Sequence, residues 1–325
     1  MKHKILLILL VCCIAAVCGG CPIVSTNENK PRLTAQPPAQ QQEASAPQSG
    51  SSFSRAEIQA LFDDAFTERP ELFEREAPDE PICTDYTDKG FLRVSYEGEP
   101  GVKYKLQVLK DNQNIVYNLF ADGSVQDFSL QFGDGKYTAR IMENIRNDEY
   151  FAAESENFRV KMDGENIAFL TSVQNIDWNY DMRPIEDVPV VISDALTQQQ
   201  RDLIAGCVRD AYRFVTDNVE YDDGKIFDLQ YNYLPDIEQT YADRTGICYD
   251  YSALLASMLR SLGIPAKLVK GYASYAPDTY HAWNEVYLNG RWIVIDATYD
   301  ASLPGEFNSS NMEKDTDDYA KVYEY

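Results

Sequence analysis

Short runs with alternating apolar and polar positions follow one another between residues 84 and 162. They span 91–96, 102–108, 115–120, 128–132, 137–141 and 158–162. Pairs such as Asp122-Gly123 separate them and are typical of turns. Alternation predicts strands with one buried face, and short strands spaced roughly ten residues apart favour an antiparallel sandwich. No catalytic cluster is evident here, so we predict a small all-β domain that serves as a spacer or binding module.

Helical spacing dominates two other segments. In residues 53–83, Ser54 and Glu57 form a capping-box pattern before an apolar stripe that predicts a helix over 54–66. Thr197 and Gln200 repeat the pattern before a stripe that continues to about residue 218. Cys207 lies on that stripe, where we expect a core residue. We predict a second folded unit over 163–325, so the expected class is α+β.

The first 52 residues have neither pattern. Residues 1–21 join a basic start to an apolar run and end at Gly19-Gly20-Cys21, which is typical of a secretory signal. The ending also resembles a bacterial lipoprotein signal, in which Cys21 becomes the lipidated first residue, although Cys18 replaces the usual leucine. Residues 22–52 are polar and predict a disordered tether. We expect an extracytoplasmic protein held at the membrane by lipid alone, with simple secretion as the alternative.

Net charge and cysteine content reduce the number of function classes to consider. The formal net charge is −23, which disfavours binding to nucleic acid phosphates. After the leader, Cys83, Cys207 and Cys248 accompany Cys21. Three cysteines cannot all pair within the chain, so this is no disulfide scaffold and one thiol is left over.

A candidate nucleophilic cysteine lies in the stretch 244–250, Arg-Thr-Gly-Ile-Cys-Tyr-Asp. An apolar helical stripe follows Cys248 and stops at Gly263 and Pro265. Cys248 therefore lies near the start of a helix, where the dipole and the free N–H groups favour a thiolate. Thr245 or Asp243 is expected to cap this helix, and Gly246 to permit a turn that exposes the sulfur.

Two partners follow in a hairpin. Extended runs over 280–288 and 291–298 are joined by Asn289-Gly290, the strongest short signal for a two-residue turn. This register makes Asp296 a diagonal neighbour of His281, about 7–8 Å away at Cα. The opposite face of the ribbon is nearly all apolar and is expected to pack inward, leaving the His281 face to meet the Cys248 helix. His281 is the only histidine besides His3.

Cys248, His281 and Asp296 can form a nucleophile, a general base and an orienting carboxylate. The backbone N–H of Cys248 is a reasonable oxyanion donor, and Tyr231 and Tyr233 are candidates for a second one. Spacing alone is a weak signal, since a lone histidine is more often structural. A zinc site is disfavoured because close ligand pairs are missing, and we expect no cofactor.

The blocks around Cys248, Gly263-Ile264-Pro265-Ala266, His281-Ala282-Trp283 and Trp292 to Asp296 resemble the transglutaminase-like superfamily. The resemblance covers about residues 200–300. It implies a papain-like core, in which a helix bearing the nucleophile packs on an antiparallel sheet, and it maps Cys248, His281 and Asp296 onto the catalytic triad. Members of the family include crosslinking enzymes, peptidases and proteins with no known activity.

We therefore expect a cell-surface thiol enzyme that acts on peptide or side-chain amides through a thioester at Cys248. Hydrolysis is favoured over acyl transfer, because nothing in the sequence identifies an amine site. The substrate is expected to be a protein or peptide, with cell-wall peptides as one candidate. The alternative is a surface binding or assembly protein that keeps the core as a scaffold.

Overall fold

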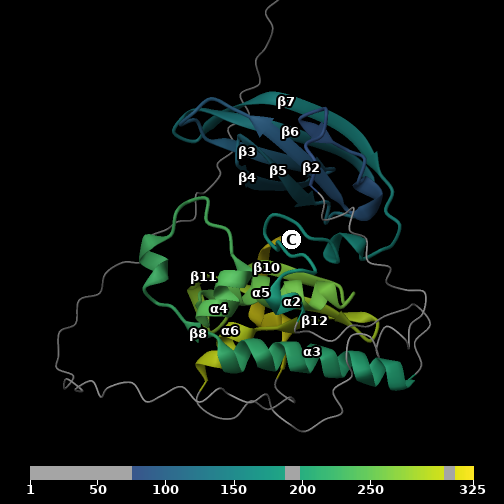
Figure 1. The fold of residues 1–325 in the computed structure, drawn as a ribbon, viewed down its shortest axis with the longest axis vertical. Coiled ribbons are helices and arrows are strands. Elements are labelled where there is room, and N and C mark those ends of the chain that lie inside the picture. Colours follow the sequence, from purple (N-terminus) through teal and green to yellow (C-terminus); the bar gives the residue numbers. More distant parts are fainter. Residues whose placement is uncertain (1–74, 187–197, 304–311) are drawn as a thin grey trace, which may run out of the picture. The chain divides into compact units, whose positions relative to one another are not determined.

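The computed structural model describes residues 75–186, 198–303 and 312–325, and these fall in a single compact unit. The predicted leader, tether, helix over 54–66 and Thr197 cap lie outside the described residues. Strands β2–β7 gather in one part of the ribbon, while β10–β12 and the helices gather in another (Figure 1).

The β-rich part contains two antiparallel sheets. The first has the order β1-β2-β5, with β1 Ile82–Cys83, β2 Phe91–Glu97 and β5 Asp122–Ser129. The second has the order β4-β3-β6-β7, with β3 Tyr104–Lys110, β4 Gln113–Leu119, β6 Gly135–Arg146 and β7 Glu149–Val160. Alternating residues such as Leu106 and Val108 are fully buried, as the period-two pattern predicts.

Two details of this part differ from the sequence prediction. Asp122-Gly123 was expected to be a turn but begins β5, where the register with β2 shifts and Gly123 takes a φ of 80°. Strand β7 is longer than predicted and mostly exposed. It pairs only with β6 and lies at the sheet edge, so its side chains need no buried alternation.

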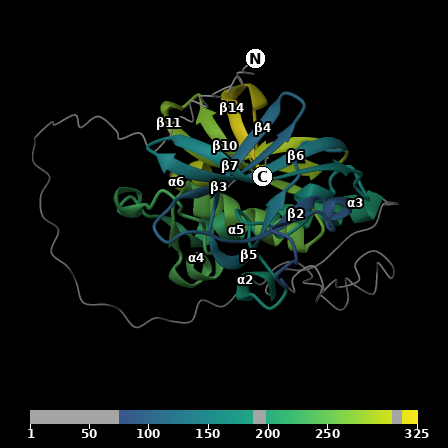
Figure 2. The ribbon, with the colours of Figure 1, turned by 90° about the horizontal axis from the view of Figure 1, so that it is seen from above.

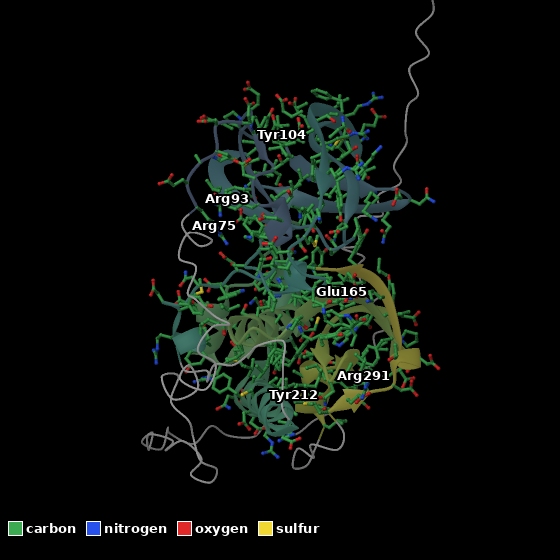
Figure 3. The ribbon with its side chains drawn as sticks, turned by 90° about the vertical axis from the view of Figure 1, so that its right-hand side faces the viewer. Arg75, Arg93, Tyr104, Glu165, Tyr212 and Arg291 are labelled. Carbon is green, nitrogen blue, oxygen red and sulfur yellow. The ribbon has the colours of Figure 1, made fainter. Side chains whose placement is uncertain are left out.

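A buried ion pair stabilises the first sheet. Arg93 on β2 donates through Nε and Nη2 to Asp127 on β5, at 2.9 and 3.0 Å, and both side chains are almost fully buried. Arg75 approaches the same carboxylate, with Nε 3.3 Å from Oδ2. Figure 3 shows the two arginines in the same region.

The rest of the described chain is built on a five-stranded antiparallel sheet in the order β13-β12-β11-β10-β14. Its strands are β10 Ala266–Ala273, β11 Ala276–Leu288, β12 Arg291–Ile295, β13 Glu313–Lys314 and β14 Tyr319–Glu324. Figure 2 shows β14 beside β10, in agreement with their register. The predicted hairpin is confirmed, since Leu288 pairs with Arg291 and Asn284 with Ile295 across Asn289-Gly290.

The helices are α2 Arg183–Glu186, α3 Gln198–Asn218, α4 Ile237–Asp243, α5 Cys248–Ser261 and α6 Ala297–Ser302. Single 3-10 turns occur at Thr87–Lys89, Ile167–Phe169, Lys225–Asp228 and Thr316–Asp318. A two-residue parallel ladder joins β8 Glu220–Tyr221 to β9 Thr245–Gly246. This ladder fixes the chain after α3 against the residues just before α5.

Helix α5 is the buried centre of this part, because every residue from Tyr249 to Ser261 is buried. It ends at Ser261, two residues before the predicted stop at Gly263, whose φ of 73° suits glycine. Arg260 in its last turn is fully buried, yet it donates to the carbonyl oxygens of Ala266, Thr171 and Tyr325. Burial lowers the pKa of Arg260 to about 9.

The body of α5 packs on the apolar face of the hairpin. Asn284, which lies on the opposite face of β11 from His281, donates through Nδ2 to the carbonyl oxygen of Ser252 in α5 at 2.9 Å. The prediction that the His281 face would meet the helix is therefore wrong for the helix body. Burial of the apolar hairpin residues against the leucines of α5 explains this arrangement.

Candidate active site

Cys248 is the first residue of α5 and is half-buried. Unpaired backbone N–H groups at a helix start favour negative charge on such a thiol. The predicted caps, Thr245 and Asp243, do not fill that role: Thr245 lies in β9, and Asp243 is the last residue of α4. Ile247 occupies the N-cap position, and its N–H donates to Asp250 Oδ2 at 2.9 Å.

Asp250 is a fully buried carboxylate that joins the helix start to the loop before α4. Its Oδ2 also accepts from Lys225 Nζ at 2.7 Å, and its Oδ1 accepts from the Tyr233 hydroxyl. Gly246 is required here for space rather than for a turn. A Cβ on Gly246 would lie 2.7 Å from the Asp250 Cβ.

His281 on β11 interacts with both other members of the predicted triad. Its Nε2 lies 2.9 Å from Asp296 Oδ2. The other ring nitrogen, Nδ1, is then available to Cys248, whose hydrogen bonding and negative charge also raise the pKa of His281. The β11–β12 ladder stops at the pair Asn284–Ile295, so β12 does not extend alongside His281. The ring can therefore meet the first turn of α5 although the helix body packs on the other face.

Asp296 follows β12 directly and caps α6, accepting the Tyr299 N–H on Oδ1 at 3.0 Å. Its Oδ2 accepts from His281 and from two phenols, Tyr275 at 2.8 Å and Tyr319 at 3.0 Å. The carboxylate is fully buried. Burial alone would raise its pKa, but the hydrogen bond and charge of His281, with the other donors, lower the pKa below its usual value.

Burial acts on His281 in the opposite direction and would lower its pKa. Hydrogen bonds and negative charge from Asp296 and Cys248 outweigh it and raise the pKa of His281 to about 10. The imidazole is therefore a cation at neutral pH, beside a thiol at a helix start. This is the arrangement that a thiolate–imidazolium pair requires.

The other thiols lack these features. Cys207 is buried on α3, and burial raises its pKa to about 11. Burial also raises the pKa of Cys83. Among the described residues, no three His, Cys, Asp or Glu side chains are grouped to hold a metal ion. The chemistry that the site can perform is thus nucleophilic attack by sulfur with acid–base help from His281.

The tyrosines predicted as oxyanion donors are engaged elsewhere. The Tyr233 hydroxyl donates to Asp250, and the Tyr231 ring lies under Lys103 Nζ at 4.4 Å. Tyr221, which no sequence pattern indicated, is the tyrosine next to the nucleophile, because burial and the negative charge of Cys248 raise its pKa while the backbone of Cys248 lowers it. A two-residue strand has no periodicity, so β8 left no signal that could have identified it.

A nucleophile helix packed on an antiparallel sheet that carries a His–Asp pair defines a papain-like thiol-enzyme core. Residues 192–297 match the model of the transglutaminase-like superfamily, so the chain carries a transglutaminase-like core, as the sequence motifs predicted. No helix among the described residues is long and apolar enough to cross a membrane.

Individual relatives share only part of their length with this chain. Kyphoscoliosis peptidase of Homo sapiens is 28% identical over 122 residues, which is 35% of this chain and 18% of the human protein. A candidate cysteine protease from Cytophaga hutchinsonii aligns with a TM-score of 0.34 and 17% identity, covering 72% of this chain and 75% of that one. Red sea bream transglutaminase aligns with a TM-score of 0.29 and 13% identity, covering 67% and 49%.

Proposed function

We propose that this protein is a cell-surface thiol hydrolase that cleaves peptide or side-chain amides through a thioester at Cys248. The observation that carries the proposal is the position of His281, whose Nε2 lies 2.9 Å from Asp296 Oδ2 and whose pKa is raised by both Asp296 and Cys248. The charge on the imidazole supports a thiolate as the resting nucleophile.

In the first half of the reaction the Cys248 sulfur attacks the amide carbonyl carbon, and a C–S bond forms. The backbone N–H of Cys248 and the neighbouring Tyr221 hydroxyl are the donors that we propose for the developing oxyanion. His281 then gives its Nδ1 proton to the amide nitrogen, the C–N bond breaks, and the amine leaves. Asp296 keeps Nε2 hydrogen-bonded throughout.

In the second half a water molecule attacks the thioester. His281, now neutral, accepts a proton from the water, the C–S bond breaks, and the thiolate and imidazolium return. An amine in place of water would give a transferred acyl group instead. We favour hydrolysis because Cys248 is half-exposed and water is always present.

The test is a panel of protein and peptide amides, including cell-wall peptides, incubated in H2¹⁸O with and without a fluorescent primary amine. Incorporation of ¹⁸O into a new carboxyl group would support hydrolysis, and incorporation of the amine would support transfer. Cys248→Ala should abolish both, whereas Cys207→Ala in the core of α3 should not. If Cys248→Ala changes no product while the wild type is active, the proposal fails. A wild type that is inactive on every substrate would favour the scaffold alternative.

The location is part of the proposal. If Cys21 carries lipid, labelled fatty acid should be incorporated into the full chain and not into a Cys21→Ser variant, and the wild type should fractionate with membranes. Release of unlabelled wild-type protein into the medium would favour simple secretion instead.

A further inference from the structure

Lys270 on β10 faces the first turn of α5, the turn that begins with Cys248. It pairs with Ala282 on β11 and Tyr323 on β14, so its side chain lies on the same face as Ala282, toward α5. Its Nζ lies 3.4 Å from the ring centroid of Tyr249, the residue that follows Cys248. The Tyr325 ring is 5.2 Å from the same atom.

No carboxylate pairs with Lys270 among the described residues, although other lysines of this sheet are paired. Lys267, three residues earlier on β10, lies 3.0 Å from Glu324 and 3.5 Å from Glu285. Lys321 on β14 contacts the same two glutamates, at 2.7 and 2.8 Å. Of these three lysines, Lys270 is the one whose side chain lies on the α5 face of the sheet. On that face it has no ion pair with a glutamate among the described residues.

The titratable groups around Lys270 are phenols and one thiol. Tyr249 comes from α5, Tyr280 from β11, and Tyr323 and Tyr325 from the β14 end of the sheet. Burial raises the pKa values of Tyr249, Tyr280 and Tyr325, which keeps these phenols neutral. Cys248, the proposed nucleophile, is therefore the group near Lys270 whose reactive form carries a negative charge.

Charge on Cys248 and charge on Lys270 are coupled. Burial lowers the pKa of Lys270 to about 7, and negative charge on Cys248 acts in the opposite direction. Because the coupling is mutual, an ammonium at Lys270 must stabilise a thiolate at Cys248 by the same amount. When Cys248 becomes a neutral thioester, Lys270 loses that partner, so the stabilisation is present in the resting enzyme and disappears after acylation.

We propose that Lys270 is a positioning residue that stabilises negative charge on Cys248 from the α5 face of the sheet, while His281 does so from the other face. This rests on the proposed function only in making Cys248 the nucleophile. His281 can donate a proton, and Asp296 holds its imidazole in place. Lys270 contributes its charge alone, so arginine should replace it and an uncharged side chain of similar length should not.

The experiment compares Lys270→Met and Lys270→Arg with Lys267→Met as the matched control. Lys267 is on the same strand and is equally aliphatic, but it faces the opposite side and is paired with glutamates. The rate of Cys248 alkylation by iodoacetamide is measured from pH 5 to 9 by peptide mass spectrometry of the full chain. We expect Lys270→Met to lower the rate about tenfold near pH 6 and to move the rise of the rate to higher pH by about one unit. Lys270→Arg and Lys267→Met should follow the wild type.

A second readout covers the case in which Lys270→Met lowers the stability of the fold. The ratio of alkylation by anionic iodoacetate to alkylation by neutral iodoacetamide reports local positive charge within one preparation. It should fall several-fold in Lys270→Met or Lys270→Gln and not in Lys270→Arg. An unchanged profile and an unchanged ratio in the uncharged variants would overturn the inference. Alkylation needs no turnover, so failure of the proposed hydrolase function would leave this result separate.

Discussion

Replacing Asp296 by asparagine should lower the pKa of His281 by two units or more, so that the imidazole begins to lose its charge near neutral pH. The two side chains have nearly the same shape, so the amide can still contact the Tyr275 and Tyr319 hydroxyls and cap α6. What is lost is the negative charge that lies 2.9 Å from His281 Nε2. Burial disfavours the imidazolium. In the variant, only the hydrogen bond and the negative charge of Cys248 oppose that effect.

The size of the effect follows from the pKa of His281. A rise from 6.5 to about 10 corresponds to roughly 5 kcal/mol in favour of the imidazolium, at about 1.4 kcal/mol per unit. The His281 side chain is only 11% exposed, so solvent screening removes little of this. The hydrogen bond to Asp296 is the largest favourable contribution to this rise, and its loss should lower the pKa of His281 by two units or more.

The assay is an NMR titration of the imidazole Cε1 proton. The chain has two histidines, so a His3→Ala background leaves a single signal, that of His281. The wild type should titrate near pH 10, and Asp296→Asn should titrate below pH 8. A pKa of His281 that stays above 9 in Asp296→Asn would refute the view that Asp296 stabilises the imidazolium. Cys248→Ala in the same background measures the share that comes from sulfur.

The free energy of unfolding should depend on pH through the ionisation of His281 and Asp296. The pKa of His281 is raised on folding, so its contribution is complete below about pH 6.5 and is lost as the pH rises through about 10. The pKa of Asp296 is lowered, so the contribution of the same pair is also lost as the pH falls through that lowered value. Unfolding free energies of wild type and Asp296→Asn should therefore differ most near neutral pH and converge above pH 10.

Three further substitutions test other parts of the structure. Tyr221→Phe should lower kcat/KM by about 100-fold if the phenol serves the oxyanion, with little change in the rate of Cys248 alkylation; a full-rate enzyme would exclude that role. Gly246→Ala should destabilise the fold by about 1–3 kcal/mol in urea, because its Cβ meets the capping carboxylate of α5, whereas Gly164→Ala, which meets nothing within 4 Å, should be close to neutral. Arg93→Met should cost up to about 3–5 kcal/mol, because its buried aspartate partner then keeps only the Arg75 contact. The exposed Arg146→Met should cost less than about 0.5 kcal/mol, and equal losses would contradict the difference in burial.

Much of the architecture could be predicted because its signals are local. The Asn289-Gly290 turn set the register of β11 and β12. Asp296 follows the last residue of β12 directly, and there its carboxylate reaches His281. The apolar stripe after Cys248 identified α5 and placed the cysteine at its start. Alternation also identified most strands of the β-rich part.

The parts that could not be predicted depend on contacts between distant segments. Asp250 caps α5 from inside the helix, and its partners Lys225 and Tyr233 come from a loop without periodicity. Tyr221 is placed by a two-residue ladder, and Tyr319 reaches Asp296 from β14. The prediction of which hairpin face packs against the helix was wrong. The sequence shows that one face is apolar, but it does not show which element packs against that face.

The two attachments of Asp250 have a consequence for engineering. Lys225 and Tyr233 are tied to a carboxylate that caps the nucleophile helix, so residues 226–232 form a segment fixed at both ends. Between these two hydrogen-bonded residues, Phe227 is 88% exposed and Tyr231 is 54% exposed. The segment can therefore serve as a replaceable cassette, in which length and composition are varied in a library while the helix start, and with it the reactivity of Cys248, is kept constant.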